Sequence, residues 1–204
     1  ATLSGGNLVF GDSSPMPGIN IVDACICGAS PVIIRTAELV LNCAGPTDLT
    51  GLLMVEPLAV LEGSSAIRVT GNFGWGHGTI RGTGTTEQFE IASGALAQFD
   101  APQGPAVPRI FSNRSFLNFG TINWIAPNAT EINDGADFGN LSGGLIDINV
   151  PGATVDFASN LLGAPYLFNA GSITVSQGQL RVDVQFDNSG SLDVGSNVAI
   201  LRQS

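Results

Sequence analysis

One short element recurs through the second half of the chain and limits the folds that the chain can adopt. Each copy has an aromatic or apolar residue, an asparagine, a short glycine turn, a small residue and then a strand of alternating apolar side chains. The copies are 116–125 (FLNFGTINWI), 138–148 (FGNLSGGLIDI), 167–175 (LFNAGSITV) and 186–194 (FDNSGSLDV). Their turn glycines, at intervals of 24, 27 and 19 residues, are Gly120, Gly144, Gly171 and Gly190. Similar turns at such intervals are typical of a solenoid, whose coils bury their apolar faces only against neighbouring coils.

The turn residues predict tight corners between sheets. Glycine adopts positive φ without steric cost and asparagine tolerates the left-handed region, so we expect both to turn the chain sharply. Asparagines of successive coils can also stack as hydrogen-bonded ladders. The same pattern fits a second architecture, a β-sandwich or jelly roll in which these elements are ordinary hairpin turns.

Strand patterns fill the rest of the chain, and no glycine- and proline-free stretch of about a dozen residues has helical apolar spacing. The clearest strand pattern is 178–194, where Leu180, Val182, Val184 and Phe186 share one side. We therefore predict an all-β protein, a right-handed parallel β-helix. Residues 1–45 hold all three cysteines and alternate less regularly. They are predicted to form an N-terminal cap or irregular first coils, with the solenoid body at 46–204.

The charge balance argues against several partners. The chain has seven arginines, no lysine and 17 acidic residues, for a net charge of -10. Phosphate binding needs a basic surface, so we expect no nucleic-acid partner. No apolar run approaches the roughly 18–20 residues of a membrane span, so we also expect no such span.

The three cysteines are candidates for one disulfide bond. Cys25 and Cys27 lie two residues apart, so they face the same side of a strand and rarely pair with each other. Cys43 follows about one coil later and could stack beside either of them, leaving one cysteine over. Three cysteines without a nearby histidine make an incomplete zinc site, so no metal and no cofactor are expected. A disulfide implies an oxidising, extracellular location.

Three Asn-x-Ser/Thr triplets are candidate sites of N-glycosylation. They begin at Asn113, Asn128 and Asn140. They matter only if a glycosylating cell secretes the protein.

From Val69 to about Leu201 the chain resembles a β-helical repeat module of large secreted or surface-anchored bacterial proteins. The pattern W-x-x-G-x-I-x-G-x-G-T-T occurs at 75–86, and it is followed by N-x-G-T coils at 118–121, 169–172 and 188–191. The first third of the chain, with its cysteines, does not match. The resemblance implies a β-helix that serves as a spacer, a stalk or an adhesive surface, and it indicates almost nothing about biochemical activity.

The only histidine, His77, lies in a Gly-His-Gly triplet that is similar to the catalytic turn of pectin-degrading β-helix hydrolases. Those enzymes also need clustered aspartates, and the chain lacks their Asn-Thr-Asp, Asp-Asp and lysine elements. We therefore predict Trp75 and Ile80 as inward packing residues and His77 as an exposed turn residue. A polysaccharide lyase would need calcium-binding acids; the candidate acids are Asp134, Asp137, Asp147 and Asp156. The segment NDGAD at 133–137 has no calcium-loop spacing and is predicted to be a surface turn.

These observations favour a non-enzymatic extracellular structural protein, a self-assembling subunit of a surface filament, sheath or layer. Residues 190–204 show no recognisable polar cap, and an uncapped solenoid accepts strands from another molecule, so the expected partner is a further copy of the chain. The alternative is an adhesin or carbohydrate-binding stalk, with Trp75, Trp124 or Tyr166 as exposed sugar-stacking platforms and glycans as partners. A β-helix polysaccharide hydrolase or lyase is the third hypothesis.

Overall fold

The computed structural model is all-β, and its strands pair in parallel. It describes residues 2–3, 7–11, 18–22, 25–56, 58–84, 86–100, 108–127, 129–159, 165–195 and 198–201. Within these ranges the chain forms strands β1 to β25 and no helix. Parallel pairing throughout identifies a β-solenoid, because a sandwich or jelly roll is built from antiparallel strands. The predicted fold class is confirmed and the alternative is excluded.

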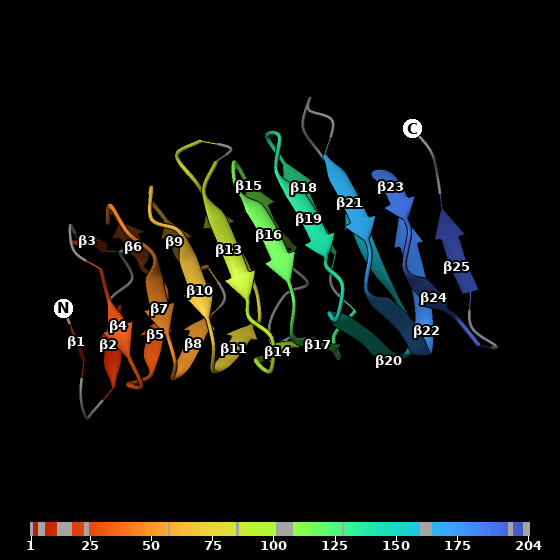
Figure 1. The fold of residues 1–204 in the computed structure, drawn as a ribbon, viewed down its shortest axis with the longest axis horizontal. Coiled ribbons are helices and arrows are strands. Elements are labelled where there is room, and N and C mark those ends of the chain that lie inside the picture. Colours follow the sequence, from red (N-terminus) through yellow and green to blue (C-terminus); the bar gives the residue numbers. More distant parts are fainter. Residues whose placement is uncertain are drawn as a thin grey trace.

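Each coil contributes one strand to each of three faces, which stack along the long axis (Figure 1). Face 1 is a nine-stranded sheet of β1 (Thr2–Leu3), β4 (Cys27–Gly28), β7 (Thr47–Leu49), β10 (Ile67–Val69), β13 (Gln88–Ile91), β16 (Ser115–Asn118), β19 (Asp137–Asn140), β21 (Tyr166–Asn169) and β23 (Gln185–Asn188). Face 2 contains β2 (Leu8–Phe10), β5 (Val32–Ile34), β8 (Leu52–Val55), β11 (Asn72–Trp75), β14 (Leu96–Phe99), β17 (Thr121–Trp124), the first halves of β20 (Leu145–Ala158) and β22 (Ser172–Val182), and β24 (Ser191–Asp193).

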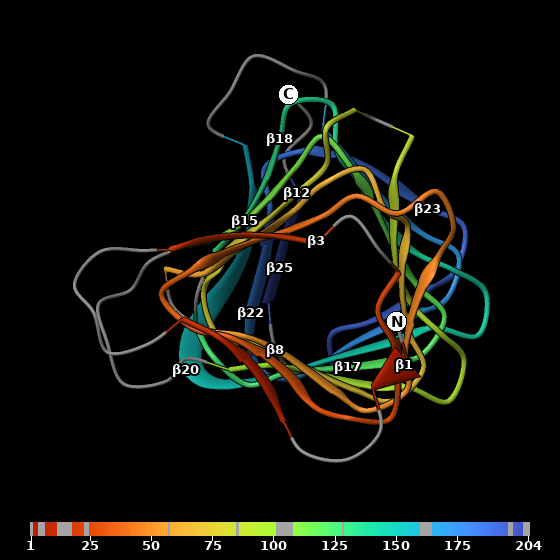
Figure 2. The same ribbon diagram turned by 90° about the vertical axis from the view of Figure 1, so that its left-hand side faces the viewer.

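Face 3 follows face 2 along the chain. It contains β3 (Ile19–Val22), β6 (Glu38–Leu41), β9 (Val60–Glu62), β12 (Gly78–Arg81), β15 (Arg109–Ser112), β18 (Thr130–Asn133), the second halves of β20 and β22, and β25 (Val198–Leu201). Viewed from the N-terminal end, the chain passes from face 1 on the right to face 2 below and face 3 at the upper left (Figure 2). It turns clockwise as it recedes, which makes the solenoid right-handed.

The strands before residue 46 already belong to the solenoid. Strand β2 pairs with β5, and β5 pairs with β8, in the parallel register of the later coils. Strand β3 pairs with β6 in the same way. The described part of 1–45 therefore forms first coils that continue into the body at 46–204.

Alternation along each strand places one set of side chains in the solenoid interior. Strands β6, β8, β16 and β17 each repeat a half-buried residue followed by a buried one. The inward residues stack in columns because parallel pairing aligns equivalent positions of successive coils. On face 1 the rings of Phe89, Phe116 and Phe138 form such a column, with centroids 5.4 and 4.4 Å apart. The predicted inward residues Trp75 and Ile80 are fully buried.

The turn glycines of the repeat serve a purpose that differs from the predicted one. None of Gly120, Gly144, Gly171 and Gly190 has a positive φ. A Cβ atom at any of the four would instead overlap a backbone carbonyl oxygen of the preceding coil, that of Ala95, Asn118, Gly144 or Gly171. Glycine is required there because adjacent coils approach closely at the corner, and the backbone conformation does not demand it.

Candidate functional surfaces

A disulfide joins the first coils at the corner before face 1. Cys25 is bonded to Cys43, 18 residues further on, with a Cα–Cα distance of 5.1 Å. The amide of Cys43 donates to Ser65 Oγ of the next coil at 2.6 Å. The half-buried Cys27 on β4 has a free thiol. The prediction of one coil-to-coil disulfide with one cysteine left over is therefore confirmed.

His77 is buried, so the predicted exposed turn residue is wrong. Only 1% of its surface is accessible, and both neighbouring glycines are also buried. The reason is the packing of this corner on the preceding coil, where Gly76 N donates to Val55 O at 3.3 Å and Thr79 N donates to Ala59 O at 2.9 Å. The imidazole therefore has no direct access to a polymeric substrate.

Arg109, which the sequence reasoning missed, closes the same corner from inside. It is fully buried at the start of β15, where its Nε donates to Trp75 O at 2.8 Å and its Nη2 donates to Asp100 O at 2.5 Å. Its guanidinium carbon lies 5.3 Å from the ring centroid of Phe99 and 5.4 Å from that of Trp124. Burial lowers the pKa of Arg109 to about 9, against the opposing effect of the Asp100 charge. The sequence does contain a signal for this burial, because Arg109 lies two residues before the inward Phe111 and side chains two apart on a strand point to the same face.

A second buried arginine occupies the corner between β15 and β16. Arg114 Nη2 donates to Gly63 O at 2.6 Å, two coils away, and burial lowers the pKa of Arg114 to about 10 while Glu87 opposes this. Burial alone would raise the pKa of Glu87. Hydrogen bonds from its own backbone N–H, from Thr83 Oγ1 and from Gly84 N, together with the charge of Arg114, outweigh burial and lower it. Both arginines therefore donate to backbone carbonyl oxygens of earlier coils of their own chain.

The outward arginines form ion pairs, most of them with carboxylates of other coils. Their ion pairs are Arg35–Glu56 at 2.9 Å, Arg68–Glu90 at 3.0 Å, Arg81–Glu38 at 3.3 Å, Arg81–Glu62, Arg181–Asp156 at 2.9 Å and Arg181–Asp183 at 3.0 Å. Such exposed pairs contribute about 0–1 kcal/mol each. Each described arginine therefore has a carboxylate or carbonyl partner, and the remaining surface charge is mainly negative.

An asparagine ladder runs along the end of face 1. Asn118 Nδ2 donates to Asn140 Oδ1 at 2.8 Å, Asn140 Nδ2 to Asn169 Oδ1 at 2.7 Å, and Asn169 Nδ2 to Asn188 Oδ1 at 2.7 Å. The first three asparagines are fully buried, whereas Asn188 is exposed. Every donor points toward the next coil, so the ladder has a direction. The ladder that the N-x-G turns predicted is confirmed.

The three candidate glycosylation sites lie in different environments. Asn113 is half-buried at a corner and has a φ of 50°. Asn140 is a buried member of the ladder, and a glycan on its Nδ2 would displace the hydrogen bonds to Asn169 and Ser172. Asn128 lies outside the described residues.

The four candidate acids do not converge. Asp134 is in the exposed turn that 133–137 was predicted to form, and Asp137 begins β19 on face 1. Asp147 accepts a hydrogen bond from Ser176 on face 2, and Asp156 pairs with Arg181 on face 3. Among the described residues, no group of three or more His, Cys, Asp or Glu side chains could hold a metal ion.

The proposed sugar-stacking aromatics are mostly internal. Trp75 and Trp124 are fully buried, so the prediction that they form exposed platforms is wrong. Trp75 on β11 and Trp124 on β17 both occupy inward-facing positions, so they lie in the core. Trp124 Nε1 also donates to Ala126 O at 3.0 Å. Tyr166 is half-buried on face 1, with its hydroxyl 3.0 Å from Asp187 Oδ2.

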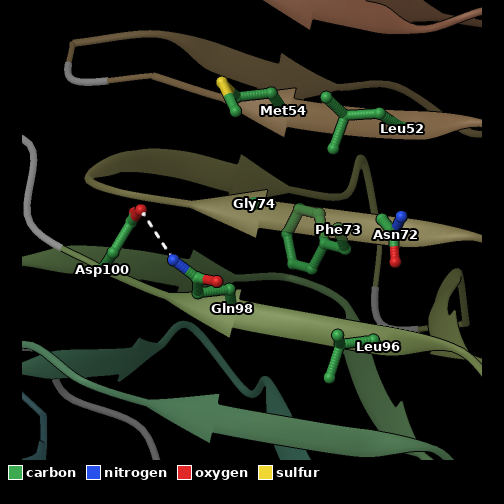
Figure 3. Close-up of a pocket in the computed structure, with 8 residues that line it drawn as sticks. All are labelled: Leu52, Met54, Asn72, Phe73, Gly74, Leu96, Gln98 and Asp100. Atoms are coloured by element: carbon green, nitrogen blue, oxygen red, sulfur yellow. Dashed lines mark hydrogen bonds between the residues drawn. The ribbon is translucent and has the colours of Figure 1, made fainter.

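The outer surface of face 2 carries an open depression of about 280 Å³ over Gly74 (Figure 3). Strands β8, β11 and β14 form it, and its lining residues are Leu52, Met54, Asn72, Phe73, Gly74, Leu96, Gln98 and Asp100. Gln98 Nε2 donates to Asp100 Oδ2 at 3.3 Å at its left-hand end (Figure 3).

We find no match to this chain among protein families, curated proteins or solved structures. Among the described residues, no helix has the length and apolar character that a membrane span requires.

Proposed function

We propose that the protein is a non-enzymatic extracellular structural protein that assembles with copies of itself. The observation that carries the proposal is the direction of the asparagine ladder. Asn188 accepts from Asn169, so its own amide hydrogens point away from the preceding coils, and its side chain is exposed. It can donate to a backbone carbonyl oxygen of a coil supplied by a second molecule, as Asn169 Nδ2 donates to Ser191 O of the following coil at 2.9 Å.

Two features of the solenoid support a structural role. The ladder, the stacked phenylalanines and most of the arginine ion pairs join one coil to another, so these interactions follow the axis and do not converge on a reaction centre. The Cys25–Cys43 disulfide supports an oxidising, extracellular location. Contacts that join the end of one solenoid to the start of another use two different surfaces of the subunit and are therefore heterologous. Such contacts build filaments when they do not close into a ring.

Electron microscopy and light scattering of the purified chain over a wide concentration range test the proposal. We expect unbranched filaments whose mass per length is that of solenoids joined end to end. Asn188→Asp should reduce assembly strongly, because a carboxylate offers no hydrogen to the next coil. Gln185→Glu makes the same chemical change on the same strand outside the ladder and should leave assembly unchanged.

A strictly monomeric chain at every concentration would overturn the proposal. Equal loss of filaments in the Gln185→Glu and Asn188→Asp variants would show that net charge, and not the ladder, controls assembly. Filaments of unchanged yield in the Asn188→Asp variant would show that copies join elsewhere.

A further inference from the structure

The depression over Gly74 arises from one missing side chain. The outward residues of face 2 align in a column that includes Met54, Gly74, Gln98 and Asn123. Side chains project from this column in the coils on either side, so glycine leaves a gap between Met54 and Gln98 (Figure 3).

The backbone does not require glycine at this position. Gly74 has no positive φ, and a Cβ atom there would meet only Met54 Cε at 3.3 Å and Met54 Cγ at 3.7 Å. Both atoms belong to a flexible side chain. This distinguishes Gly74 from the corner glycines, where a Cβ would overlap the backbone of the preceding coil. The gap is therefore a property of the surface and not a by-product of a tight turn.

The walls of the depression combine two kinds of group. Leu52, Met54 and Leu96 supply apolar surface, and Leu96 remains 41% exposed. Asn72 lies at one end of the gap, and the hydrogen-bonded pair of Gln98 and Asp100 lies at the other (Figure 3). Carboxamides donate and accept hydrogen bonds, and a carboxylate accepts them.

We propose that this depression binds one ring of a neutral hexopyranose. Such a ring has apolar C–H faces and a rim of hydroxyl groups, which match the leucine and methionine walls and the amide and carboxylate ends. Asp100 and the acidic surface disfavour phosphorylated, sulfated or carboxylated sugars. The volume lies just below the range of about 300–1,000 Å³ found for pockets of drug-sized ligands, which suits one ring. Self-assembly is not needed for this binding, so the two proposals can fail separately.

The experiment is a titration of the isotope-labelled chain with the methyl glycosides of glucose, galactose, mannose and N-acetylglucosamine, one at a time, followed by amide NMR shifts. At least one sugar should shift the amides of 72–74 and 96–98 with a dissociation constant of roughly 1–10 mM, as expected for a small ligand on an open site. Gly74→Val should fill the gap and weaken this binding at least about tenfold. Asn123→Ala, in the same column but outside the lining, should bind as the wild type does.

Gly74→Ala provides a second variant that keeps the fold, because its added methyl group contacts only the end of Met54. It should weaken binding by a smaller factor than valine does, and Gln98→Ala should weaken it by removing a rim donor. The proposal is overturned if none of the four sugars shifts these amides. It is also overturned if the shifts map to another face, or if both Gly74 variants bind as tightly as the wild type.

Discussion

Replacing Asn140 tests whether the asparagine ladder stabilises the C-terminal coils. Its side chain is fully buried and makes three hydrogen bonds of ordinary length: Nδ2 to Asn169 Oδ1 at 2.7 Å, Nδ2 to Ser172 O at 3.0 Å, and Oδ1 from Asn118 Nδ2 at 2.8 Å. A net contribution of about 1 kcal/mol for each bond gives about 3 kcal/mol. The unpaired Asn169 oxygen and the small cavity raise the expected cost of Asn140→Ala to about 3–5 kcal/mol.

Asn140→Asp separates hydrogen bonding from packing, because it keeps the side-chain shape. It replaces the Nδ2 donor with an oxygen that faces Asn169 Oδ1 and Ser172 O, so at neutral pH it should cost at least as much as alanine does. Burial would raise the pKa of this carboxyl in the folded state above its unfolded value. The variant should therefore recover stability as the pH falls through the folded pKa, since the protonated carboxyl can donate again.

Urea denaturation followed by circular dichroism measures the free energy of unfolding, and hydrogen exchange shows where protection is lost. Protection should fall first in β19, β21 and β23, because a solenoid is held together by neighbouring coils. Asn123→Ala, on the outer side of β17, is the control and should change stability by less than about 0.5 kcal/mol. If both Asn140 variants unfold within that margin of the wild type, the ladder does not contribute as argued.

Three further outcomes are expected. Cys25→Ala should lower the free energy of unfolding by about 3 kcal/mol in denaturation experiments, whereas Cys27→Ala should leave it nearly unchanged; equal effects would contradict the role of the disulfide. Arg109→Ala should cost about 3–5 kcal/mol, because it leaves a cavity and two unpaired carbonyls, and the exposed Arg68→Ala should cost less than about 1 kcal/mol in the same assay. Burial raises the pKa of Asp137 above its ordinary 3.8, so its ionisation destabilises the fold as the pH rises. Asp137→Asn should therefore be more stable than the wild type at neutral pH, and this gain should vanish below pH 3.8; a gain that persists there would rule out titration as its cause.

The sequence predicts well which segments form strands and which of their side chains point inward. The reason is that the alternation of inward and outward residues continues across the corners. Leu180 and Val182 lie on β22 and Val184 lies in the corner before β23, and all three are buried as predicted. Phe186 on β23 continues the same phase and packs against the core. The alternating run at 180–186 therefore covers two faces, and the segment 178–194, which resembles a single strand in the sequence, is divided among β22, β23 and β24.

The sequence predicts burial at corners poorly, because a corner is covered by coils that lie about 20 residues or more away along the chain. His77 resembles an exposed turn residue when its own neighbours are considered, yet the preceding coil buries it. Arg114 resembles a solvated residue, yet it reaches Gly63 two coils away. Both outcomes depend on which residues the other coils place at the same corner, and local patterns contain no such information.

The column that ends in the ladder changes its chemistry along the axis. In face 1 the inward position occupied by Leu49, Val69 and Ile91 in the earlier coils becomes Asn118 in β16 and remains asparagine through Asn188. Aliphatic contacts have no direction and tolerate small shifts between coils, and among the first coils the Cys25–Cys43 disulfide ties one coil to the next at a single point. The amide of a buried asparagine needs a hydrogen-bond acceptor at one fixed position in the adjacent coil. Buried polar residues specify register in this way in coiled coils. The ladder therefore fixes the register of the later coils, and a further coil that joins at Asn188 must place a side-chain or backbone oxygen within hydrogen-bonding distance of its amide.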